Sequence, residues 1–324
     1  MGLVSTAGSW VTLVGGTWLF GLLLVTRLVL SDVPPAAAGT AWGQGRQRVA
    51  RRLSISVDVA ATAVLLGVIA GLSVAAWRVL DAGLAPGLVA SIGTVLSTTF
   101  GQLTVVRGFL VASLWLLVRG GLPERALPDA SKRAGERLFV TSWALLALGV
   151  LVTMSLTGHA GASGSPAVHT VADTIHLIAA SAWLAGIGVL GLVLPEVLAR
   201  QRPRVQLQVL APAFSRFARL AMIAVPVLLL TGLYAADAAL GDPQALRTSP
   251  YGQFLLVKSW LFLSVVALGA VNHLLLVPRL VRAAQARGRL RTDDRLAFTV
   301  AMEVVLALAI LTVTSVLIGL ARPS

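Results

Sequence analysis

The stretch HTVADTIHLIAASAWLAG, residues 169–186, combines a long apolar run with three ionisable side chains. The run continues far enough to cross a bilayer as a helix, since about 20 apolar residues span roughly 30 Å of hydrocarbon. His169, Asp173 and His176 are spaced i, i+4 and i+7, which places them on one face of that helix, and Trp183 extends the same face. Ionisable groups inside hydrocarbon are costly and usually mark a pathway or a site. The alternative is that they are buried partners that hold two helices together.

The composition places this helix in a membrane protein. Of the 324 residues, 57% are hydrophobic and 12% are charged, about half the charge of an average soluble domain. The net charge of +13 could favour nucleic-acid binding, but the basic residues gather in alternate connections between the predicted helices. The chain has no cysteine, which excludes disulfides, thiolate metal sites and cysteine nucleophiles. Any binding of a soft metal must therefore use histidine, methionine or carboxylate.

Hydropathy predicts an all-α membrane protein with eight transmembrane helices. The first helix has no basic residue before Arg27, so we expect it to be retained rather than cleaved as a signal peptide. Gly93, Gly101 and Gln102 interrupt the third helix, which predicts a bent or re-entrant start. The expected helices cover residues 8–30, 54–79, 87–118, 137–158, 167–198, 210–236, 251–277 and 296–320.

Basic residues alternate sharply between successive connections. Most of the 26 Lys and Arg residues lie around the connections that follow the first, third, fifth and seventh helices, and the 158–168 connection has none. The positive-inside rule then places these four segments in the cytoplasm and both termini outside. The high net charge is therefore a topology signal rather than an indication of nucleic-acid binding.

Short motifs recur between the two halves of the chain. FGQLTVVRGFL at 100–110 matches YGQFLLVKSWL at 251–261, and GTWLFG at 16–21 matches SAWLAG at 181–186. We interpret residues 1–158 and 159–324 as two four-helix repeats with the same orientation in the membrane. The chemistry is not repeated, because all four histidines lie in the second unit, and Val11 occupies the position that matches His176.

Three potential metal ligands are expected at the external face. Met154 and His159 lie at the outer end of the fourth helix, and His169 begins the fifth. Imidazole suits Cu²⁺ and thioether favours Cu⁺. His176 lies about 10 Å deeper than His169 at 1.5 Å per residue, so we expect two successive stations, with Asp173 able to orient either imidazole.

Other charged groups inside the predicted helices must pair or face a cavity. Lys258 and Glu303 are supporting candidates for gating or charge compensation, and Tyr251 opens the motif that carries Lys258. Arg107 matches Lys258 in the first repeat, and we expect it to form a structural ion pair. A helix-end ion pair is also expected for Asp58, with Arg51 or Arg52.

The second unit resembles the copper resistance D (CopD) family of bacterial inner-membrane proteins. The resemblance covers about residues 155–320 and rests on the stretch from His169 to Gly186 and on segments such as SRFARLAMIAVPVLLLTGLY and TSPYGQFLLVKSWLFLSVVALGAVNHLLLVPRL. It implies copper transport or handling with His159, His169 and His176 as the copper ligands. A separate periplasmic copper carrier of the CopC type is an implied partner. The family's usual pattern has arginine after the asparagine where this chain has His273.

Two other functions stay open at this stage. The helix bearing His176 also resembles one in haem-biosynthetic membrane oxidases, which implies a haem-binding redox enzyme. Bis-histidine ligation needs two facing histidines at mid-membrane depth, and His273 lies too near the inner surface to be an easy partner for His176. The other alternative is an assembly factor that presents copper to a partner without transporting it. Copper transport by a non-enzyme is the function that we expect.

Overall fold

The computed structural model describes residues 2–30, 39–125, 133–158, 166–199, 201–285 and 294–320. Within these ranges the chain forms helices and short turns, without a β-strand. Eight of the helical segments are long and apolar enough to cross a membrane. The all-α membrane class and the number of predicted spans are therefore confirmed.

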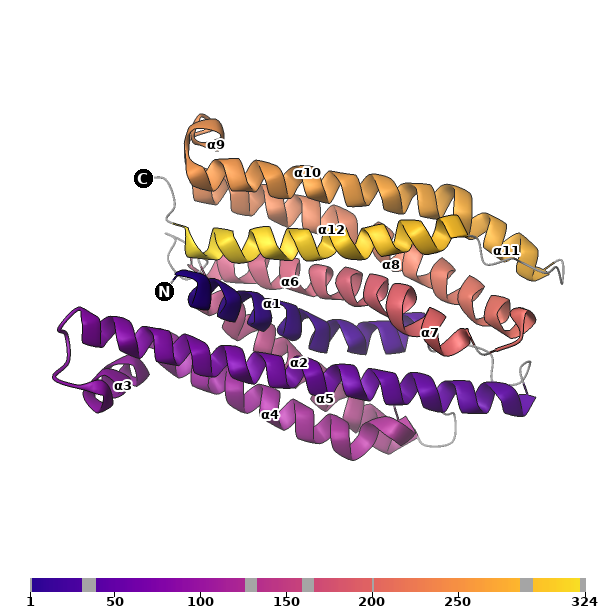
Figure 1. Cartoon of the computed structure of the whole chain (residues 1–324), viewed down its shortest axis with the longest axis horizontal. Coiled ribbons are helices and arrows are strands. Elements are labelled where there is room, and N and C mark those ends of the chain that lie inside the picture. The colour runs from indigo at the N-terminus through magenta and orange to yellow at the C-terminus, as the bar shows by residue number, and fades with distance from the viewer. Residues whose placement is uncertain are drawn as a thin grey trace.

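The long helices lie roughly side by side, and several are built from consecutive pieces (Figure 1). The segments labelled η are short π-helical turns inside the spans, and such turns are frequent at functional sites. The elements are α1 (Gly2–Leu24), η1 (Val25–Val29), α2 (Gly39–Asp81), α3 (Leu88–Ser97), α4 (Thr99–Arg125), α5 (Arg133–Thr157), α6 (Pro166–Gly188), η3 (Val189–Val193), α7 (Leu194–Leu198), α8 (Pro203–Leu240), α9 (Ala245–Thr248), α10 (Pro250–Val271), η4 (Asn272–Leu276), α11 (Val277–Gln285) and α12 (Asp294–Gly319).

The predicted bend at the start of the third span is present. Thr98 has an extended backbone and separates α3 from α4. Its hydroxyl accepts a hydrogen bond from the Gly101 amide at 3.1 Å, which caps α4. A Cβ on Gly101 would lie 2.0 Å from the Val95 carbonyl oxygen, so only glycine lets α3 fold back this closely.

The same arrangement occurs at the start of α10. Ser249 is extended, and its hydroxyl accepts from the Gly252 amide at 3.0 Å. A Cβ on Gly252 would lie 2.3 Å from the Ala245 carbonyl oxygen of the short helix α9. The shared aromatic-Gly-Gln motif thus has the same local function in both halves, which supports the predicted duplication. The duplication and the division at residue 158 stay predictions.

Helices α1 and α6 occupy the centre of the bundle. Helix α1 packs against α2, α5, α6 and α12, while α6 packs against α1, α5, α8 and α12. A Cβ on Gly21 of α1 would lie 2.0 Å from the carbonyl oxygen of Ser181 in α6. Small residues allow such close crossings, where dispersion contacts stabilise the helix pair inside a membrane. The helix that carries His169 and His176 is therefore held in the core of the molecule.

Charged pairs join helices near the end of the bundle that carries α7 and α11 (Figure 1). Arg27 pairs with Glu136, and Arg52 pairs with Glu196. Asp58 accepts from Trp115 at 2.7 Å and from Arg119 at 3.0 Å. The expected pairing of Asp58 with Arg51 or Arg52 is therefore wrong. Arg52 and Arg51 lie six and seven residues before Asp58, nearly two helical turns away, and the neighbouring helix α4 presents Arg119 at the level of Asp58.

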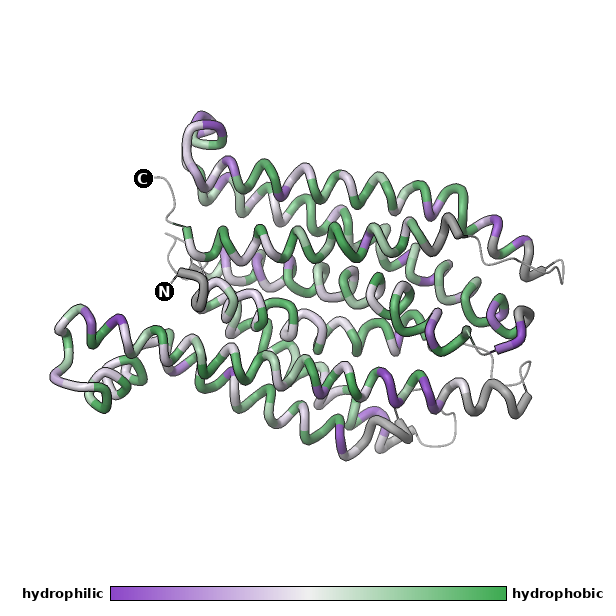
Figure 2. Tube along the Cα trace, in the orientation of Figure 1, coloured by the Kyte–Doolittle hydropathy of each residue, from purple (hydrophilic) through white to green (hydrophobic). Residues whose placement is uncertain are grey.

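Hydrophobic residues dominate the middle of the bundle, and hydrophilic residues gather towards the helix ends (Figure 2). The start of α1 and the end of α12 lie at the end of the bundle that carries α9, opposite α11 (Figure 1). This arrangement agrees with an even number of spans. Which end faces the cytoplasm stays a prediction from the basic residues.

Candidate functional site in the second half

His176 is held by a hydroxyl from the neighbouring helix α8. Its Nδ1 lies 2.8 Å from Oγ1 of Thr231. The Thr231 hydroxyl donates its only hydrogen to the Val227 carbonyl at 2.6 Å, so it can serve His176 only as an acceptor. This network assigns the imidazole hydrogen to Nδ1 and leaves Nε2 as the nitrogen with a free lone pair. A metal-ligating histidine is commonly oriented in this way by its second nitrogen.

His169 lies against an aromatic ring of the same helix α8. The rings of His169 and Tyr234 are 5.1 Å apart between centroids and inclined by 30°. His169 is half-buried and Tyr234 is 37% exposed. Both histidines of α6 are therefore positioned by residues that lie three apart on α8, Thr231 and Tyr234.

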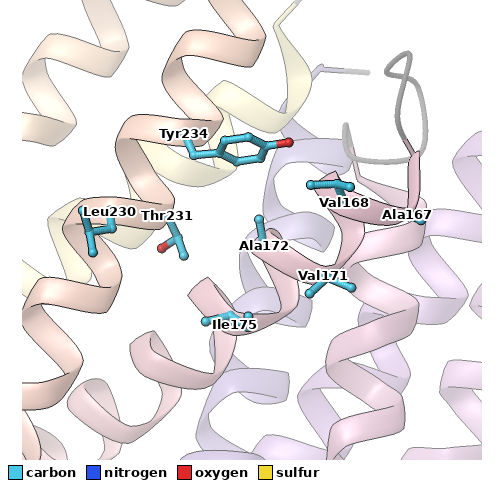
Figure 3. Close-up of a pocket in the computed structure, with 8 residues that line it drawn as sticks. All are labelled: Ala167, Val168, Val171, Ala172, Ile175, Leu230, Thr231 and Tyr234. Carbon is cyan, nitrogen blue, oxygen red and sulfur yellow. The ribbon is translucent and has the colours of Figure 1, made fainter.

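A shallow apolar groove of about 480 Å³ runs between these helices beside the two histidines. Thr231 and Tyr234 project from α8 towards α6, and Ala172 lies opposite them (Figure 3). The lining residues are Ala167, Val168, Val171, Ala172, Ile175, Leu230, Thr231 and Tyr234. Since Val168 and Val171 are largely exposed, the groove opens to the surroundings of the bundle.

Lys258 of α10 completes the polar cluster. It lies near enough to Asp173 and to His176 of α6 for their charges to interact. The side chain is half-buried, within a span whose remaining surface is mainly exposed. An amine beside the histidines offsets the negative charge of Asp173, and it also opposes the arrival of a metal cation.

The described residues contain no group of three or more His, Asp or Glu side chains that could together hold one metal ion. The expectation of two successive stations stays a prediction. His159 lies outside the described residues. Met154 places its Sδ against Gly16 of α1, where an added Cβ would lie 2.6 Å from the sulfur. Its predicted grouping with His169 stays a prediction.

Several polar residues of this region were not anticipated from the sequence. Thr231 and Tyr234 lie in an apolar stretch without any charged motif, and only the crossing of α6 and α8 identifies them. On α6 itself, the hydroxyls of Thr170 and Thr174 are buried without a partner in the described part of the chain. Their i, i+4 spacing repeats that of His169 and Asp173 and could have been noticed.

An apolar layer closes the bundle beyond His176. It contains Trp183 about two turns further along α6, Leu228 on α8, Val265 on α10 and Ala307 on α12. All four side chains are at least nine-tenths buried. Trp183, on the face of α6 that carries the histidines, thus belongs to the apolar layer that separates His176 from the other end of the bundle.

A second polar cluster lies on the far side of this layer. Asn272 donates to Oε1 of Glu303 at 2.7 Å and accepts from the Thr299 hydroxyl at 2.7 Å. Glu303 is 5% exposed and Asn272 is 7% exposed. Asn272 begins the π-helical segment η4, and the adjacent His273 has a buried Nδ1 without a partner among the described residues.

The remaining predicted residues lie apart from both clusters. Arg107 is buried and bonds the hydroxyls of Thr153 and Thr157 and the Thr153 carbonyl, all near the C-terminal end of α5. The expected ion pair of Arg107 is therefore replaced by bonds to a helix end, where the macrodipole favours a cation. Tyr251 is half-buried in the first turn of α10, and its supporting role stays a prediction.

These features define a polytopic helical membrane protein with a histidine-bearing polar cluster in one half. Residues 211–317, from α8 to α12, match the sequence model of a family described as Copper resistance protein D. The chain is also 30% identical over 183 residues to the copper transport protein CutJ of Bacillus subtilis (strain 168). The matched region lies within the part of the chain whose sequence resembles the CopD family.

Both matches cover only part of the proteins compared. The alignment to CutJ covers 56% of this chain and 32% of that protein, so the chain spans about a third of the relative's length. The matched family region includes Thr231, Lys258 and Glu303 but not the histidines of α6. No solved structure matches the chain.

Proposed function

We propose that this protein moves copper across the membrane through its second half. The observation that carries the proposal is His176, an imidazole inside a membrane span with Nδ1 held by Thr231 and Nε2 left for a metal. The match of residues 211–317 to a copper resistance family and the likeness to a copper transport protein support copper as the metal. The same likeness favours a transporter over an enzyme.

Copper enters at the end that bears His169 and Tyr234 and passes to His176, roughly 10 Å further along α6. His159, Met154 and Tyr251 belong to the entrance in this proposal. A site with few ligands suits transfer, because an ion must bind well enough to enter and weakly enough to leave. Lys258 repels the cation while Asp173 attracts it, so the pair sets how long copper stays. A CopC-like carrier could deliver the ion from outside the bacterial plasma membrane.

Copper flux into vesicles tests the proposal. The purified protein is reconstituted with a trapped copper-sensitive dye, and Cu⁺ and Cu²⁺ are added separately. We expect His176→Ala to reduce the initial rate about ten-fold or more, in line with the loss of a metal ligand. The matched control is Thr174→Val, which changes a buried polar residue on another face of the same helix.

Metal analysis and an absorption spectrum of the purified protein separate this function from the redox alternative. We expect bound copper that falls when His169 or His176 is replaced, without the strong Soret band of haem. A Soret band lost in His176→Ala would contradict copper transport and favour a haem enzyme. Copper binding without copper flux in the wild-type protein would leave copper presentation as the function, and unchanged flux in His176→Ala would contradict a role of His176 in the pathway.

A further inference from the structure

We propose that Glu303 is a binding site for a monovalent cation, a proton or sodium, that is exchanged at the α11 end of the bundle. The first reason is its position inside a membrane span. Glu303 lies nine residues after the start of α12, roughly 14 Å along the helix axis. Its side chain is 5% exposed, so water compensates little of its charge.

The second reason is that neighbouring side chains do little to neutralise the negative charge of the Glu303 carboxylate. Asn272 is a neutral donor and bonds only Oε1 of the carboxylate. Among the described residues no Lys, Arg or His nitrogen lies within ion-pair distance of Glu303. A carboxylate that is buried without a counter-charge is strongly destabilising, and a bound cation removes that penalty.

The groups on the surrounding elements do not supply the missing charge. Helix α12 packs against α1, α6, η3, α10 and η4, and α1 and η3 carry no titratable residue. On α10, Lys258 lies about four turns from Asn272 along the helix, with the apolar layer between them. His273 of η4 directly follows Asn272 in the sequence. The titratable residues of these elements are His169, Asp173, His176, Tyr251, Lys258 and His273.

The third reason is that hydrogen bonds hold Asn272 and Glu303 in one relative orientation. Thr299 donates to Asn272 Oδ1, which fixes the amide so that its Nδ2 faces Glu303. Gly269 of α10 lies beside the carboxylate, where a Cβ would lie in ordinary contact, 3.6 Å from Oε1. The turn of η4 starts at Asn272, and such π-helical turns are frequent at functional sites. Oxygen atoms in a fixed arrangement suit a proton or a small hard cation.

Infrared difference spectra test the proton directly, without copper. We expect a pH step to change the C=O stretch of a buried carboxylic acid in the wild-type protein, and Glu303→Gln to remove that change. Glu196→Gln is the matched control, because Glu196 is half-exposed and paired with Arg52. If sodium is the cation, the carboxylate band instead responds to sodium at constant pH, and Glu303→Gln abolishes that response. A spectrum without either Glu303-dependent change overturns the proposal.

Flux measurements test whether the cation is linked to the proposed copper transport, on which this part rests. We expect wild-type copper flux to depend at least several-fold on the pH or sodium gradient and Glu303→Gln to remove that dependence while copper binding is retained. An unchanged gradient dependence in Glu303→Gln overturns the link. If the wild-type protein moves no copper, the proposed function fails, and the infrared result still decides whether Glu303 binds a cation.

Discussion

Thr231 has one hydroxyl hydrogen, and its bond to the Val227 carbonyl leaves an oxygen lone pair for the Nδ1 hydrogen of His176. Replacing Thr231 with valine keeps the shape but removes the acceptor. We expect copper affinity in Thr231→Val to fall roughly 10- to 100-fold, the usual effect of losing a partner that orients a ligating histidine. Equilibrium titration with a competing copper chelator measures the change.

The matched variant for this position is Thr231→Ser, which keeps the hydroxyl and should bind copper nearly as the wild-type protein does. Equal affinity in the valine and serine variants would show that the hydrogen bond does not position His176 for copper. Replacement of His176 itself should remove the effect of Thr231→Val, because the threonine acts only through the imidazole.

The positive charge of Lys258 repels a copper ion bound at His176. The same side chain interacts with the negative charge of Asp173. Lys258→Gln should therefore lower the Kd for copper by about five-fold, or on the order of 1 kcal/mol. Flux should slow at saturating copper, since the ion leaves less readily. Arg247→Gln, at an exposed position of α9, is the control for a general loss of positive charge. Weaker copper binding in Lys258→Gln would mean that Lys258 acts mainly by holding the helices in place.

At the scale of elements, glycines determine how closely the helices approach. Gly21→Ala would place a Cβ 2.0 Å from the Ser181 carbonyl oxygen, so α1 and α6 would have to separate. We expect a loss of stability of about 1–3 kcal/mol, typical of an overpacked core. The apparent Tm in detergent, measured through tryptophan fluorescence, should fall by several degrees.

Gly120→Ala is the control for this change, because an added Cβ on Gly120 meets no atom within 4 Å. It should leave the Tm unchanged or raise it slightly, since alanine has the higher helix propensity. An equal Tm for the two variants would mean that α1 and α6 can separate at no cost.

The short motifs of the sequence could be matched between the halves but not explained from the sequence alone. The aromatic-Gly-Gln motif was recognisable as a repeat, and its glycine proves to be the residue that admits a short helix against the next span. The π-helical turns were not predicted, because a π turn inserts a single residue into an otherwise regular helix. The π-helical turns that follow α1 and α6 start at Val25 and Val189. The number of residues between these two starts is nearly the same as between Gly16 and Ser181, which begin the matching motifs of the two halves.

At the scale of the whole molecule, the two halves pack differently. In the first half, α2 and α4 pack along much of their length, while the corresponding α8 and α10 barely touch. Helix α10 instead packs on α12, and it is the least buried of the eight spans. The half that carries the polar clusters is thus the more loosely packed one, as expected for a part of the molecule that moves.

The orientation of the bundle can be tested because the natural chain has no cysteine. Asp242 and Arg282 are exposed at opposite ends of the bundle, beside α9 and on α11. We expect Asp242→Cys to react with a membrane-impermeant maleimide in intact cells and Arg282→Cys to react only after permeabilisation. The opposite pattern would reverse the orientation and with it the proposed direction of copper entry.

The sequence by itself determined the class of protein, the eight spans, the break before Gly101 and the histidine-bearing helix. These features depend on hydropathy, glycine and spacing along one helix, which are local properties. Only the tertiary structure decided which residues meet: Thr231 with His176, Tyr234 with His169, Asn272 with Glu303, and Asp58 with Arg119. Inside a membrane the hydrophobic effect hardly distinguishes one apolar helix face from another. Partners there are selected by close packing and by individual hydrogen bonds between helices, which the sequence of a single helix does not contain.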